Sequence, residues 1–225
     1  MKIDPKKYAD KPQGPAVPVT GLLAIVVTRI DYEVMRYDEG DTPIATFNAV
    51  VCNGVPKNKK DDTEKMKALI GREVGFLKQY LTEKEQNVDS IGHLCHAMGT
   101  DAIGKGEKTP TLRAVFEDKD TQAIFAKQVC GKPILVEIAV KERDGRAPIT
   151  YINAWRAPKN AAELLKTFNE FVKQGTVEGL LPEGERWRNV ESKKKGGGDR
   201  GTARKTSSPM PDDDVPDYDD SELPF

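Results

Sequence analysis

Apolar and polar residues alternate in the early part of the chain in the pattern of β-strands. Leu22–Val34 is rich in β-branched residues, and apolar and charged positions alternate through its second half. Ile44–Val51 predicts a second strand, and the polar segment Asp38–Asp41 predicts the turn between them. We therefore expect the fold to begin with a β-hairpin.

The spacing of apolar residues then becomes helical. In Met66–Leu81 they recur every three or four positions, which predicts one helix of several turns with a single apolar face. A shorter helix is expected to begin with Asp89 as its N-cap. Thr121–Val129 predicts a further helix, which ends before Gly131 and Pro133.

A second hairpin is predicted late in the chain. Ile134–Val140 and Ile149–Trp155 are apolar segments of strand length, and the Asp144-Gly145 pair between them is typical of a tight turn. Ala161–Gln174 follows as an amphipathic helix. This order predicts a mainly β protein with helical insertions, of the α+β class. Our first choice of architecture is a five-stranded oligonucleotide-binding (OB) barrel, whose one-sided groove suits an extended strand of nucleic acid.

Charge divides the chain into two parts. Its 225 residues include 35 Lys and Arg and 36 Asp and Glu, which nearly cancel. Seven of the acidic residues follow Ser208, where there is no basic residue, so the rest of the chain has 35 basic against 29 acidic residues, a net charge of +6. A basic body joined to an acidic arm is typical of a nucleic-acid binder with an internal competitor.

Four regions follow from these patterns. Residues 1–20, rich in Lys and Pro, are expected to form an extended arm, and residues 21–190 the folded domain. Residues 191–208 are a basic segment rich in Gly and Ser, which is typical of a flexible linker. Residues 209–225 are an acidic tail, too charged to collapse on itself and therefore expected to be disordered.

Cysteine and histidine are sparse. Cys52, Cys95 and Cys130 lie far apart, so we expect no disulfides. No segment has the pattern of a signal peptide or approaches the ~20 apolar residues of a membrane span. We therefore expect a cytoplasmic protein without a membrane partner. His93 and His96 have no further ligand at zinc spacing, so we expect no metal and no other cofactor. No arrangement of residues predicts catalysis, so we do not expect an enzyme.

The tail and parts of the body resemble a known family. Asp219-Asp220-Ser221-Glu222-Leu223-Pro224-Phe225 is an acidic run that closes on an apolar tip. It resembles the tails of bacterial and bacteriophage single-stranded DNA-binding proteins. The segments IGHLCHAMG and GKPILVEIAVKERDGRAPITYINAW resemble small phage proteins encoded among replication and recombination genes, which are regarded as OB-fold single-strand binders.

The resemblance implies a protein that coats single-stranded DNA non-specifically during phage DNA replication, recombination and repair, in the host cytoplasm. It implies that the tail recruits replication or recombination proteins through its acidic side chains and apolar tip, namely Asp219, Asp220, Glu222, Leu223, Pro224 and Phe225. The residues leave a second function open, that of a protein-interaction adaptor without nucleic-acid binding. They also leave homo-oligomerisation open.

Single-strand binding needs aromatic side chains on which bases stack and basic side chains for the phosphates. Alternation places Tyr151, Asn153 and Trp155 on one face of the late hairpin, although aromatic residues on strands also serve as core residues. The basic candidates near them are Arg143, Arg146, Arg156 and Lys159. The early hairpin, the loop after it and a later segment add Tyr32, Arg36, Tyr37, Phe47, Lys57, Lys59, Lys60 and Arg113.

Overall fold

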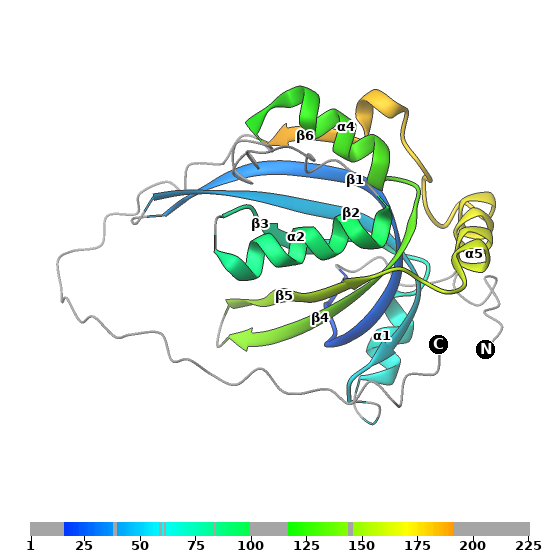
Figure 1. Ribbon diagram of the computed structural model, residues 1–225. Coiled ribbons are helices and arrows are strands. Elements are labelled where there is room, and N and C mark those ends of the chain that lie inside the picture. Colours follow the sequence, from blue (N-terminus) through cyan, green and yellow to red (C-terminus); the bar gives the residue numbers. More distant parts are fainter. Residues whose placement is uncertain are drawn as a thin grey trace. The chain divides into compact units, whose positions relative to one another are not determined.

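The computed structural model describes residues 16–37, 40–58, 60, 62–82, 84–99, 117–143 and 146–190 (Figure 1). Of Arg36, Tyr37, Gly40, Arg146 and Ala147 it describes the backbone alone. The first fifteen residues of the predicted arm, the predicted linker and the predicted acidic tail lie outside the described residues.

Six strands of the described residues form one sheet: β1 (Gly21–Tyr37), β2 (Gly40–Pro56), β3 (Glu73–Tyr80), β4 (Pro133–Arg143), β5 (Arg146–Arg156) and β6 (Trp187–Val190). The strand order is β3-β2-β1-β4-β5, with antiparallel neighbours throughout, and β6 pairs with β1 in parallel. In the described residues no ladder joins β3 to β5, so the sheet is not closed. The mainly β prediction is confirmed. Five strands were expected and the described sheet has six, of which neither β3 nor β6 was predicted as a strand.

Four α-helices are described: α1 (Thr63–Leu69), α2 (Glu85–Met98), α4 (Lys119–Val129) and α5 (Ala161–Lys173). In Figure 1, α2 lies between β3 and the β4–β5 hairpin. Its buried face includes Ile91, Leu94 and Met98, and Ser90 Oγ donates a buried hydrogen bond of 2.7 Å to Gln79 Oε1 on β3. The helix therefore fills the opening that the unpaired edges of β3 and β5 leave in the sheet.

Strand β1 changes partner near its middle. Gly21–Val26 pairs with β4, whereas Ile30–Glu33 pairs with β6. Between these segments the register of β1 against β2 shifts, which makes Thr28 an extra residue on β1, a β-bulge. A bulge bends its strand. One long strand can therefore join two parts of the sheet that run in different directions.

Strand β3 corrects the prediction of one helix over Met66–Leu81. The helix α1 ends at Leu69, and Gly71, in the left-handed region with a φ of 76°, turns the chain toward β3. Val74 and Leu77 are both buried although they are three residues apart, because the register of β3 against β2 shifts between them. The bulge thus produced the spacing of a helix within a strand.

The other helices follow the sequence more closely. The helix expected with Asp89 as its N-cap begins earlier, at Glu85, and its buried residues include Ile91, Leu94, Cys95 and Met98. The predicted helices Thr121–Val129 and Ala161–Gln174 are confirmed as α4 and α5. Asp118 caps α4, since its carboxylate accepts hydrogen bonds from the Thr121 amide at 2.8 Å and hydroxyl at 2.6 Å. None of the described helices is long and apolar enough to cross a membrane.

Candidate nucleic-acid interface

Trp155 belongs to the hydrophobic core. Its side chain is 3% exposed, and its ring packs edge-on against Phe47 with 5.3 Å between centroids. Phe47 and Tyr32 are buried as well. A buried ring has no free face for a base, so the prediction that Trp155, Phe47 and Tyr32 contact DNA is corrected: all three stabilise the fold.

A β-bulge separates Tyr151 from Trp155. The pairing of β5 with β4 shifts register at Asn153, which is an extra residue on β5. A shift of one residue moves the side chains that follow to the opposite face. Tyr151, opposite Ala139, therefore lies on the outer face with 44% of its surface exposed, while Trp155 faces the core. The single face predicted for the two aromatics is wrong for this reason.

The surroundings of Tyr151 are partly basic. On the outer face of the β4–β5 hairpin, the side chain of Lys141 lies two pairs beyond Tyr151 and is exposed. On the other side, Arg156 Nη2 lies 3.3 Å from Glu137 Oε2 in an ion pair. A base stacked on Tyr151 would thus lie close to cationic groups from both strands.

The other predicted basic residues are dispersed. Arg143 is exposed at the end of β4. Exposed loop residues of the prediction are Lys57, Lys60 and Lys159. Arg36, Tyr37 and Arg146 are placed by their backbone alone. The candidates outside the described residues are Lys59, Arg113, Asp219, Asp220, Glu222, Leu223, Pro224 and Phe225.

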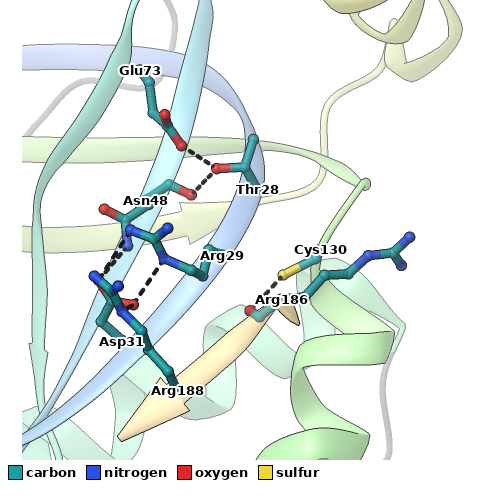
Figure 2. A network of polar contacts seen from close by, with 8 residues as sticks. All are labelled: Thr28, Arg29, Asp31, Asn48, Glu73, Cys130, Arg186 and Arg188. Atoms are coloured by element: carbon teal, nitrogen blue, oxygen red, sulfur yellow. Dashed lines mark hydrogen bonds and ion pairs between the residues drawn. The ribbon is translucent and has the colours of Figure 1, made fainter. Parts of the chain in front are cut away.

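The outer face of β1 carries a polar network that the sequence did not predict as a unit (Figure 2). Asp31 Oδ1 accepts hydrogen bonds from Nε of Arg29 at 2.9 Å and from Nε of Arg188 at 2.8 Å. Asp31 Oδ2 accepts from Nη2 of the same two residues at 3.4 and 3.2 Å, and from Asn48 Nδ2 at 3.0 Å. One carboxylate therefore holds two guanidinium groups, each along its Nε–Nη2 edge.

The bulge in β1 positions this network. Buried Thr28 places its Oγ1 within hydrogen-bonding distance of the Asn48 carbonyl oxygen, at 3.1 Å, and of Glu73 Oε1, at 2.6 Å. The side chain of Asn48 has room because Gly75 lies opposite, where a Cβ atom would be 3.0 Å from Asn48 Oδ1. Alternation along β1 did place Arg29 and Asp31 on its polar face, but nothing local indicates that Arg188 joins them.

Asp31 is ionised at neutral pH. Burial acts to raise the pKa of its carboxyl, but the hydrogen bonds from Arg188, Asn48 and Arg29 and the charge of Arg29 outweigh burial and hold the pKa below its ordinary value. A carboxyl with a depressed pKa in the folded state stabilises that state above its unfolded pKa, about 3.9, and this contribution is lost as the pH falls through the folded pKa.

We therefore expect the Asp31→Asn variant to unfold at a lower urea concentration than the wild type at pH 7. The gap between their free energies of unfolding should narrow as the pH is lowered through about 3.9 and below, because the wild-type carboxyl then becomes protonated. Urea titrations of both proteins between pH 7 and pH 2 measure this gap. A gap that is constant over this range would contradict the ionised network.

The described residues contain little reactive chemistry. Burial raises the pKa of the Cys52 and Cys130 thiols to about 12 and that of Cys95 to about 11, so all three stay protonated at neutral pH. His93 and His96 are exposed on α2, and in this part of the chain no group of three or more His, Cys, Asp or Glu residues is placed to hold a metal ion. No protein-family model, curated protein or solved structure matches the chain.

Proposed function

We propose that the protein binds single-stranded DNA non-specifically through an OB-type barrel that α2 holds open between β3 and β5. The strand order carries this proposal. The strands lie in the order β3-β2-β1-β4-β5, and helices are inserted between β3 and β4. This is the strand order of an OB barrel that has been opened between its third and fifth strands. OB folds bind oligonucleotides across strands 2 and 3, between the loops that join strands 1 to 2 and 4 to 5.

Basic residues lie at both of these loops, and an aromatic residue lies at the first. Arg36 and Tyr37 end β1, while Arg143 and Arg146 flank the turn between β4 and β5. Both hairpins extend toward the same side of the molecule in Figure 1. A strand of DNA that runs from one hairpin to the other would thus meet cationic groups at each end of its path, and Tyr151 on β5 offers a ring for stacking.

The acidic C-terminal segment supports a role in recruiting other proteins. It has seven acidic residues, no basic residue, and ends in Leu223-Pro224-Phe225. An apolar tip on a charged arm suits a small hydrophobic pocket rimmed by basic groups on a partner protein. We assign replication or recombination proteins to this role because such partners act where single-stranded DNA is exposed.

The test is a titration of the full-length protein with fluorescent oligo-dT and with a duplex of the same length, each at low and at moderate salt. We expect tight binding to the single strand that weakens steeply with salt, because phosphate contacts release counterions, and much weaker binding to the duplex. Equal weak binding to both, or none, would contradict the proposal and favour the protein-interaction adaptor.

A further inference from the structure

We propose that Arg29 and Arg188, held side by side by Asp31, form a binding site for a phosphodiester group of the bound strand. This inference rests on the proposed single-strand binding and extends it to residues far from the hairpin loops. Asp31 acts in it as a positioning residue, which orients the two guanidinium groups and does not itself contact the ligand.

The two guanidinium groups keep most of their hydrogen-bond donors. A guanidinium has five N–H groups, and each of these two directs one from Nε and one from Nη2 to Asp31. Within the described part of the chain, no other residue accepts a hydrogen bond from the guanidinium group of Arg29 or Arg188. Their side chains are 27% and 56% exposed, so the remaining donors are accessible to an anion from solvent.

The local charge favours an anion. Two arginines and one aspartate carry a net charge of +1, and the carboxylate is only 14% exposed, with both oxygens already engaged. Of the neighbouring carboxylates, Glu33 is paired with Lys78 at 3.0 Å, and Glu73 Oε1 accepts a hydrogen bond from Thr28 at 2.6 Å, so these two contacts do not involve either arginine (Figure 2). Planar guanidinium forks match phosphate oxygens better than lysine does.

Asp31 prepares the site before the ligand arrives. Without it, two adjacent cations would repel each other and their long side chains would move apart. The carboxylate holds both in one orientation, which lowers the entropy lost when a phosphate binds. Removing the negative charge of Asp31 should therefore weaken phosphate binding. The net charge of the site alone predicts the opposite, because the site would become more positive.

The site continues the surface to which DNA binding is assigned. Arg188 is paired in register with Asp31, Asp31 with Thr46, and Thr46 with Lys78, so one row of side chains crosses β6, β1, β2 and β3. Paired residues of neighbouring strands lie on the same face. The two arginines, one on β1 and one on β6, therefore extend the β2–β3 surface to the β6 side of the sheet, where a strand leaving that surface would pass.

The test compares oligo-dT affinity across a range of salt for the wild type, Arg29→Gln, Asp31→Asn and the control Lys166→Gln, which removes one charge from the exposed side of α5. We expect Arg29→Gln to bind oligo-dT about tenfold more weakly than the wild type at low salt. The slope of the logarithm of the binding constant against the logarithm of the salt concentration should become shallower by about 0.7, because one phosphate contact is lost. Asp31→Asn should also bind more weakly, while Lys166→Gln stays close to the wild type.

Several outcomes would overturn the site. Tighter binding by Asp31→Asn, or equal affinity of Arg29→Gln and Lys166→Gln, contradicts it while leaving the proposed function intact. Failure of the wild type to bind oligo-dT contradicts the function and the site together. Urea unfolding of each variant controls for the fold, and Arg29→Gln keeps the ion pair between Asp31 and Arg188 that holds β6.

A second experiment replaces chloride with inorganic phosphate at equal ionic strength. Phosphate should not displace the DNA; if it does, the site binds free anions in place of the phosphodiester.

Discussion

Replacing Trp155 with Ala is expected to lower the free energy of unfolding by about 3–5 kcal/mol, the usual cost of removing a large aromatic ring from a core. The indole is 3% exposed and packs against Phe47, which in turn packs edge-on against Phe125 with 6.5 Å between centroids. The deletion leaves a cavity between β5, β2 and α4 that these rigid elements can close only in part. Urea or thermal unfolding measures the loss.

Trp155→Phe is the matched control. Within the described residues the indole Nε1 is buried without a hydrogen-bond partner, so Phe keeps most of the packing and removes an unsatisfied donor. We expect this variant to lose less than about 1.5 kcal/mol. If Trp155→Ala instead keeps the stability of the wild type and loses affinity for oligo-dT, Trp155 is a base-stacking residue and its place in the core is wrong.

Replacing Tyr151 with Ala is expected to weaken binding of oligo-dT by about 5- to 150-fold, which corresponds to the ~1–3 kcal/mol that stacking of one base contributes. Tyr151 is 44% exposed on the outer face of β5, so its removal leaves no cavity in the core. The free energy of unfolding should therefore change by about 0.5 kcal/mol or less. Fluorescence titration and urea unfolding of the same preparation separate the two effects.

Tyr151→Phe keeps the aromatic ring and removes only the hydroxyl, so it should bind oligo-dT like the wild type. A loss of affinity in this variant equal to that of Tyr151→Ala would assign the contact to a hydrogen bond. Unchanged affinity in Tyr151→Ala would move the binding surface away from β5. Together with the Trp155 variants, this pair tests the division that the bulge at Asn153 makes between core and surface.

Features governed by neighbouring residues were predictable from the sequence. Both hairpins, α4 and α5 were identified because a period of two or of 3.6 residues places apolar side chains on one face of a strand or helix. The capping carboxylate of Asp118 lies three residues before the Thr121 amide that it accepts from, and Gly131 adopts a φ of 86° just after α4. These interactions form within one turn of chain, so the sequence shows them directly.

The bulges were not predictable because they belong to pairs of strands. An extra residue on one strand is defined only against the partner that lacks it. Three such shifts, at Thr28, within β3 and at Asn153, moved side chains to faces that strict alternation does not predict. They account for the strand that resembled a helix and for the burial of Trp155.

The sequence by itself determined the mainly β class, the two hairpins, the basic body with its acidic end, and the placement of Arg29, Asp31 and Glu33 on one face of β1. The tertiary structure alone decided which aromatic faces solvent and which cationic groups meet. Arg188 lies 157 positions after Asp31, and only the pairing of β6 with β1 brings its guanidinium to that carboxylate. Local periodicity reports the face of a residue within its own strand, whereas a site assembled across strands depends on register, which long-range pairing sets.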